Sequence, residues 1–140
     1  MANFNGVQIN QSVTITEIAG ADVTDIRNLI VKYDENGAVV PATAGTDIPV
    51  GIAIIEAGYN DASGLESGKV TEGDDVDIQV KDIGYVLAGG TIKKGAEVTA
   101  DKDGKAVAAA AGNYVLGIAL SNAAAGSYVR VQIQKYQKNA

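Results

Sequence analysis

Four carboxylates lie close together in the 140-residue chain and are the first candidates for chemistry: Glu72, Asp74, Asp75 and Asp77. Paired carboxylates can act as acid and base in glycoside hydrolysis, and carboxylate oxygens are ligands that Ca²⁺ prefers. The cluster directly precedes an alternating apolar segment, which favours an acidic turn leading into a solvated strand face. An acidic hydrolase that depends on Asp75 or Asp77 is therefore the last of the functional hypotheses.

Two shorter acidic motifs, Asp34–Gly37 and Asp101–Gly104, resemble the start of a calcium-binding EF-hand loop. Both lack a third acidic position before the glycine, and neither has flanking helical patterns. Asp-x-Asn/Asp-Gly is also turn chemistry, because the first side chain caps the backbone and glycine accepts positive φ. We interpret both motifs as turns between strands.

Other catalytic arrangements lack their usual residues. The chain has no His and no Cys, so it has neither the commonest general base nor a thiolate metal ligand. No serine lies in a Gly-x-Ser-x-Gly elbow, and Gly89–Gly95 does not match a phosphate-binding loop. The sequence therefore predicts no enzyme, with no catalytic residue, no metal site and no cofactor.

Charge and hydropathy limit the partners. The net charge is −6, and Lys93–Lys94 is the only adjacent basic pair, so direct binding of nucleic acid or of an anionic membrane is not expected. The longest strongly apolar run, Ile48–Ile55, is far too short to span a bilayer. The N-terminus lacks the basic and apolar regions of a signal peptide, which indicates a soluble protein made in a cytoplasm.

An internal repeat organises the chain. Three pairs of segments match in the same order: Val31–Gly45 with Val98–Gly112, Val50–Ile54 with Leu116–Leu120, and Gly73–Val80 with Gly126–Ile133. Two related β units, approximately residues 28–82 and 95–135, are the natural explanation.

Each unit has the same expected elements: a strand, the Asp turn, a second strand, a Gly-Ile-Ala strand and a final alternating strand. In the last of these, Val129, Val131 and Ile133 should face the core while the polar residues between them face solvent. The alanine-rich segment Ala106–Ala111 would suggest a helix on propensity alone. Its counterpart contains Pro41 and β-branched residues, so we interpret both as extended or turn-like.

These patterns predict an all-β fold: a small β-barrel or sandwich built from two related β units, with an extended N-terminal arm. Residues 1–19 form the arm or first strand, and residues 20–140 form a single β domain. The alternation over Val7–Thr16 is typical of a strand, or of an arm that can add to another sheet. Five of the six tyrosines are scattered along the chain and are expected in the core or at its rim: Tyr59, Tyr85, Tyr114, Tyr128 and Tyr136.

Glycine and alanine patterns carry a family resemblance. The segments are Gly89–Asp101, Gly104–Val107, Val115–Leu120 and Ala123–Ile133. With a Gly-Ile-Ala strand, a short Ala/Gly loop and a closing Val-x-Val strand, the chain resembles the tailed-phage capsid decoration, or cement, proteins over roughly residues 20–135.

The resemblance implies a structural virion protein. Such a protein would bind the outer surface of the major capsid shell and stabilise the expanded head, often as a homotrimer at local three-fold positions. The expected partner is then the major capsid protein, and the expected location is the capsid exterior of a virion assembled in the host cytoplasm. The resemblance transfers no catalytic residues.

The N-terminal arm is the predicted contact with the capsid or a neighbouring subunit, by strand addition. Its apolar side chains are the candidate contact residues: Phe4, Val7, Ile9, Val13 and Ile15.

Two other binding modules remain as alternatives. A carbohydrate-binding module would usually expose more Trp, and this chain has none. A carrier-type module, like biotinyl and lipoyl domains, presents a modifiable Lys on a tight hairpin, and Ile92–Val98 resembles that turn without the hairpin.

Overall fold

The computed structural model describes residues 13–54 and 68–139, and in this part of the chain the fold is all-β, without a helix. None of these residues forms a helix that could cross a membrane. The strands are β1 (Thr14–Ile18), β2 (Ile30–Tyr33), β3 (Val39–Pro41), β4 (Gly51–Ala53), β5 (Asp75–Gln79), β6 (Ile83–Leu87), β7 (Glu97–Ala100), β8 (Ala106–Ala108), β9 (Tyr114–Ala119) and β10 (Tyr128–Gln137).

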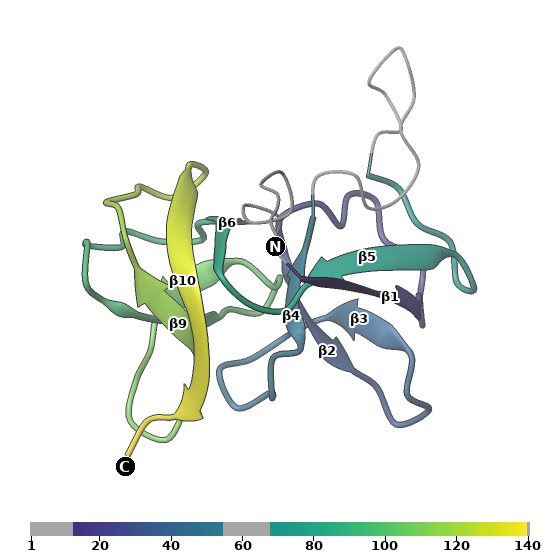
Figure 1. The fold of residues 1–140 in the computed structure, drawn as a ribbon, viewed down its shortest axis with the longest axis horizontal. Helices are drawn as coiled ribbons and strands as arrows, with labels where there is room; N and C mark the ends of the chain where they lie inside the picture. Colours follow the sequence, from purple (N-terminus) through teal and green to yellow (C-terminus); the bar gives the residue numbers. More distant parts are fainter. Residues whose placement is uncertain (1–12, 55–67, 140) are drawn as a thin grey trace, which may run out of the picture.

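The strands form two five-stranded antiparallel sheets with the same topology (Figure 1). The first sheet has the order β1-β5-β4-β2-β3, and the second has the order β6-β10-β9-β7-β8. Each strand of the second sheet therefore has the same place in its sheet as the strand whose number is lower by five, so that β6 corresponds to β1 and β10 to β5. We refer to β1–β5 as the first unit and to β6–β10 as the second; the prediction of two related β units is confirmed.

The Asp turns are the clearest local equivalence between the units. The Asp34 Oδ1 accepts backbone N–H bonds from Asn36 and Ala38, at 2.8 and 3.0 Å. In the second unit, the Asp101 Oδ1 accepts bonds of the same lengths from the N–H groups two and four residues later. Gly37 adopts a φ of 79° in the turn, which explains why the motif ends in glycine. The acidic motifs are thus turns between paired strands.

The ends of each sheet approach each other through one parallel bridge. Ala19 pairs with Val39 in the first unit, and Ala88 pairs with Ala106 in the second. A single bridge does not continue the ladder, so each sheet is curled without closing into a barrel, and the architecture is sandwich-like.

Glycine is required where the middle strands meet. A Cβ on Gly51 would lie 2.1 Å from the backbone oxygen of Gln79, and one on Gly117 would lie 2.0 Å from that of Gln132. These two glycines belong to the repeated Gly-Ile-Ala motif. Their role is close backbone approach between β4 and β5 and between β9 and β10.

Each unit has a core of aliphatic side chains. The first contains Ala19, Ile26, Val31, Val39, Val50, Ala53, Val70, Val76 and Ile78. The second includes Val86, Val98, Leu116, Val129, Val131 and Ile133. Three side chains of the first unit, Ile30, Ala42 and Ile52, are buried in the second core. This apolar junction joins the two units into one body.

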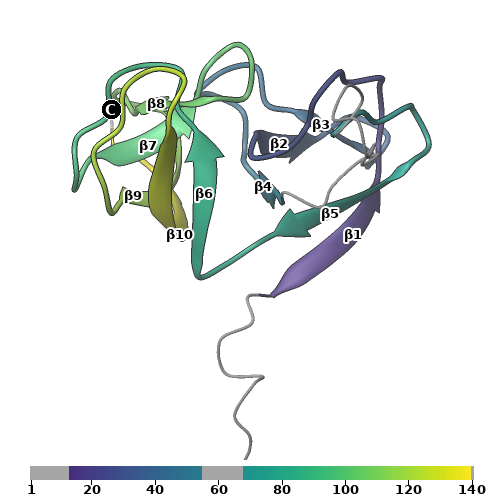
Figure 2. The same cartoon turned by 90° about the horizontal axis from the view of Figure 1, so that it is seen from above.

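The connection between the units is short and hydrogen-bonded. The Gln79 side-chain amide donates to the carbonyls of Lys81 and Ile83, both at 2.8 Å, and so holds the turn from β5 into β6. Figure 2 shows the chain passing from the end of β5 directly into β6. Across the junction, the Ile30 N–H donates to the Gly104 carbonyl, and the Tyr114 N–H donates to that of Gly45.

The strand patterns behave as predicted in two informative places. In β10, Val129, Val131 and Ile133 are buried while the residues between them are exposed. The alanine-rich segment begins as β8 and continues into a turn, so the extended interpretation is confirmed. At the N-terminus, the described strand is β1, and residues 1–12 of the predicted arm lie outside the described residues.

Candidate functional site

Two of the predicted contact residues are described: Ile15 lies on β1, an edge strand of the first sheet, and Val13 directly precedes that strand. Val13 is 44 % exposed, and Ile15 is half-buried against the first core. Side chains two residues apart in extended structure point to the same side, so Val13 and Ile15 lie on one face. Phe4, Val7 and Ile9 lie outside the described residues.

The outer edge of β1 is open for pairing. The Val80 N–H donates to the Val13 carbonyl, and the Ala19 N–H donates to the Asp74 carbonyl, so the odd-numbered residues of β1 bond to β5. By the alternation of an antiparallel ladder, the N–H and C=O groups of Thr14 and Thr16 point outward. No other described segment pairs with them, which makes β1 a template for an added strand.

The acidic cluster has local structural roles. The Asp77 Oδ1 accepts a 2.7 Å bond from the Thr16 hydroxyl on β1, and the Asp74 Oδ2 caps the Thr71 N–H at 2.8 Å. The Glu72 N–H donates to the Asp22 Oδ1 at 2.9 Å. Within residues 13–54 and 68–139, no group of three or more acidic side chains is arranged to hold a metal ion.

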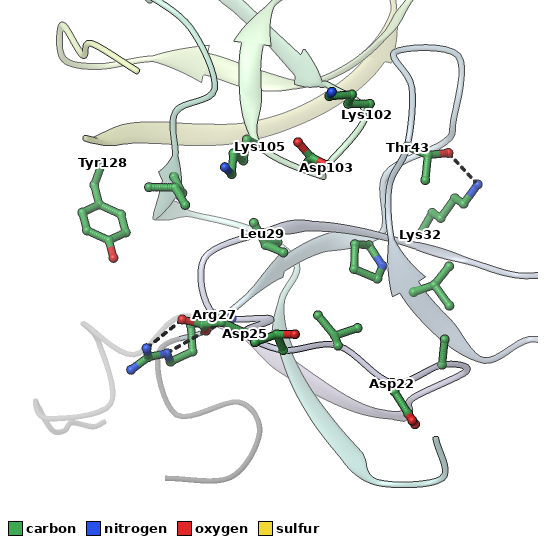
Figure 3. Close-up of a pocket in the computed structure, with 16 residues that line it drawn as sticks. Asp22, Asp25, Arg27, Leu29, Lys32, Thr43, Lys102, Asp103, Lys105 and Tyr128 are labelled. Atoms are coloured by element: carbon green, nitrogen blue, oxygen red, sulfur yellow. Dashed lines mark hydrogen bonds and ion pairs between the residues drawn. The ribbon is translucent and has the colours of Figure 1, made fainter. Parts of the chain in front are cut away.

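A groove of about 760 Å³ lies between the two units. The first unit lines it with residues that include Leu29 and Pro41, and the second unit contributes Leu87, the 102–105 turn and Tyr128. Figure 3 shows Tyr128 at one end, with the Asp25–Arg27 pair on the first unit and Lys102 and Lys105 on the second. We refer to this feature as the inter-unit groove.

The charges in the inter-unit groove are partly paired. The Asp25 carboxylate accepts two bonds from the Arg27 guanidinium, at 2.9 and 2.8 Å. Hydrogen bonds from Arg27 hold the pKa of Asp25 below its usual value and outweigh the opposing effect of burial. Lys102 and Lys105 form no ion pair with the described part of the chain. The groove therefore combines one exposed aromatic ring with charged groups of both signs.

The tyrosines that the structure describes are exposed or half-buried, and none of them belongs to the aliphatic core. Tyr85 and Tyr128 are 56 % and 57 % exposed on β6 and β10. The register places Tyr128 opposite Leu87 and Arg130 opposite Tyr85, so the two rings are diagonal neighbours on one sheet face. Sequence reasoning could not group them because they lie 43 positions apart (128 − 85) on strands whose pairing was not predicted. Tyr59 lies outside the described residues.

Comparison with known proteins decides the family. The family model of the XM1 gp53 minor capsid protein matches residues 2–133, almost the whole chain. The chain belongs to this family of phage minor capsid proteins.

A solved structure supports the same placement. The N base of the head fiber gp8.5 of bacteriophage phi29 matches with a TM-score of 0.62 and 26 % sequence identity. The match covers 93 % of this chain and 100 % of that one. The comparison with curated proteins found no match. The predicted membership of a phage capsid-associated family is thus confirmed.

Proposed function

We propose that this phage minor capsid protein binds the outer surface of the major capsid shell and stabilises the expanded head, without enzymatic activity. The observation that carries the proposal is the family match over residues 2–133. The likeness to the base of a head fiber supports an exterior location, because a fiber base joins a projecting structure to the head. The virion would be assembled in the host cytoplasm, with the major capsid protein as partner.

The open edge of β1 supports binding by strand addition. Main-chain bonds to an added strand give affinity, and alternate side chains such as Val13 and Ile15 give specificity. In this proposal the contact set is the one predicted from the sequence, namely Phe4, Val7, Ile9, Val13 and Ile15. A homotrimer would present three copies of each contact, so weak contacts would combine into a stable attachment.

Substitution of Thr16 by Pro tests strand addition directly. The Thr16 N–H points away from β5, so its loss leaves the β1–β5 ladder intact but blocks a donor for an added strand. Thr16→Val is the matched control, because it also removes the hydroxyl bond to Asp77 and keeps the N–H. We expect weaker capsid binding for Thr16→Pro alone; equal binding by both variants would contradict strand addition.

Deletion of residues 2–12 tests the arm. This deletion removes Phe4, Val7 and Ile9 and leaves β1 paired with β5, whereas a deletion reaching residue 16 would expose the edge of β5. Unchanged capsid binding after the shorter deletion would exclude the arm as a contact.

Stabilisation has its own test. Heads assembled with and without the protein are heated, and disruption is followed by DNA release. We expect release at a higher temperature from heads that carry the protein. The same release temperature for both would contradict the stabilising role.

The inter-unit groove favours one second candidate, carbohydrate binding. An exposed Tyr128 ring beside the Asp25–Arg27 pair offers a stacking face and polar groups. A glycan array with the native chain and Tyr128→Ala tests it, and binding lost in the variant would support it. The carrier-type alternative has less support: the Lys93–Ala96 turn leads into β7 from β6, two strands that are not neighbours in the sheet.

A further inference from the structure

A second groove, of about 710 Å³, lies where β1, the loop before β4 and β10 meet. Its lining is mostly apolar and comes from both units: Ile15, Lys32, Tyr33, Thr46, Asp47, Ile48, Pro49, Val50, Val80 and Lys135. We refer to it as the Lys135 groove.

Lys135 is the charged group that this groove leaves without an acidic partner. Its ammonium donates a 2.7 Å bond to the Val50 carbonyl of the first unit and forms no ion pair with the described residues. An ammonium has three donors, so two remain available. Burial lowers the pKa of Lys135, as expected for a cation partly removed from water without a carboxylate beside it.

A β-bulge directs Lys135 into the groove. The register of β10 against β9 shifts between Ile133 and Tyr136, so the strand carries an extra residue in this segment. Bulges re-aim side chains and are frequent next to functional sites. The regular alternation of β10 ends here, and the Lys135 side chain reaches the other unit.

The other cation of the groove is already neutralised. The Lys32 ammonium lies 3.1 Å from the Asp47 carboxylate, which also accepts bonds from Thr43. Burial raises the pKa of Asp47, but the bonds from Thr43 and Lys32 outweigh it and hold the pKa below its usual value. Asp47 is therefore committed to this pair, and the uncompensated charge of the groove is positive.

Exposed apolar side chains surround this charge. Ile48 is 65 % exposed and Tyr33 is 45 % exposed, both in the lining of the groove. Ile15 also lines it, and Val13 extends the same face of β1 next to Val80. The two described members of the predicted contact set thus meet the Lys135 groove.

We propose that the Lys135 groove receives an extended segment of the major capsid protein that presents a carboxylate beside an apolar side chain. The carboxylate binds the Lys135 ammonium, and the apolar side chain packs against Ile48 and Ile15. The argument for this occupant is charge complementarity, because Lys135 is the charged group of a mostly apolar lining that has no acidic partner among the described residues. The inference rests on the proposed function and specifies the chemistry of its contact.

Matched variants test the charge and the apolar wall separately. Lys135→Met removes the charge and keeps much of the length, whereas Lys135→Arg keeps the charge. Ile48→Glu adds a carboxylate that repels the incoming one, and because the Ile48 side chain is 65 % exposed, we expect this variant to fold. The controls are Lys102→Met in the inter-unit groove and Ile83→Glu on β6, which is 48 % exposed.

Binding to expanded capsids is measured by co-sedimentation of the full chain, with thermal unfolding of each variant as the folding control. We expect about tenfold weaker binding for Lys135→Met and for Ile48→Glu, and binding within about twofold of the native chain for Lys135→Arg and both controls. If the native chain binds and all variants bind equally, the groove proposal is overturned while capsid binding stands. If the native chain does not bind, the proposed function itself is overturned.

Carbodiimide cross-linking of the native chain on capsids identifies the occupant, because it joins an amine to a carboxylate in contact with it. We expect Lys135 linked to an Asp or Glu peptide of the major capsid protein. A link from Lys135 to a second copy of this chain, or links at other lysines with none at Lys135, would overturn the proposal. This readout does not depend on how the variants fold.

Discussion

The Asn28 side chain of the first unit donates a 3.0 Å hydrogen bond to the Tyr85 carbonyl of the second. Its backbone carbonyl accepts a bond from the Leu87 N–H at 2.9 Å, and its own N–H donates to Ala53. Asn28 therefore covers the outer edge of β6, which would otherwise be open like that of β1. A φ of 62° allows these contacts, and Asn tolerates that conformation better than most residues.

Substitutions at Asn28 should separate backbone strain from the side-chain bond. Asn28→Gly keeps the positive φ and loses the bond to Tyr85, so we expect destabilisation by about 1 kcal/mol. Asn28→Ala adds the strain of a left-handed residue, for a total of about 2–3 kcal/mol. Urea unfolding measures both; equal losses would show that φ carries no cost here.

The repeated Gly-Ile-Ala motif should not tolerate a Cβ. Gly51→Ala and Gly117→Ala would each place a methyl group against a strand backbone, with an expected loss of about 3 kcal/mol in the free energy of unfolding. Gly90→Ala is the matched control, because its Cβ would meet Val107 at an ordinary 3.7 Å. A control within about 0.5 kcal/mol of the native chain, beside two destabilised variants, would confirm the close approach. Native stability of Gly51→Ala would refute it.

The Asp turns should respond to substitution and not to calcium. Asp101→Ala removes an acceptor for two backbone N–H groups, and we expect a loss of about 1–2 kcal/mol. Asp103→Ala should change little, because the Asp103 side chain is exposed and caps nothing in the described structure. A calcium loop would need both residues. A rise in thermal stability on adding Ca²⁺, abolished by either substitution, would revive that interpretation.

Tyr136 should lose its hydroxyl proton at a higher pH than an ordinary tyrosine, because it is paired with Glu97. The Tyr136 hydroxyl donates to the Glu97 carboxylate at 2.5 Å, and this bond raises the pKa of Tyr136 to about 12. Hydrogen bonds from Tyr136 and Lys138 hold the pKa of Glu97 below its usual value.

The sign of the stability effect follows from these directions. The Tyr136 contribution is present below its ordinary pKa of about 10 and is lost as the pH rises towards about 12. The Glu97 contribution is present above the ordinary Glu pKa of about 4.3 and is lost on acidification. Tyrosinate absorbance should show a late phase that is smaller in Tyr136→Phe and shifts in part to lower pH in Glu97→Gln. A late component remains in both variants, because the hydrogen bond to Glu17 also raises the pKa of Tyr33. A late phase unchanged in Glu97→Gln would contradict the pair.

The equivalence of β2–β5 with β7–β10 could be predicted from the sequence. The two units keep similar residues in these segments because the turns and the close strand contacts require them. The Asp34 and Asp101 turns, and Gly51 and Gly117, have the same physical task in both units. The fifth equivalence, β1 with β6, could not be recognised, and Ile83–Leu87 was expected between the repeats. These two strands have no identical residues at equivalent positions. They share only the Ala-Gly pair that follows each of them.

The grooves lay beyond sequence reasoning for a different reason. The Lys135 groove combines β1, the 46–50 segment and β10, which no sequence spacing brings together. Its central charge also depends on a β-bulge, which breaks the alternation that sequence patterns use. Val13 and Ile15, in contrast, could be chosen from the sequence as candidate contact residues, because two apolar residues two positions apart lie on the same face of a strand.

Co-sedimentation of the native chain with expanded and unexpanded capsids of its phage tests capsid attachment most directly. We expect saturable binding to the expanded form alone, with a stoichiometry of three copies for each occupied three-fold position. Binding to neither form, or equal binding to both, would contradict the proposed attachment to the expanded head.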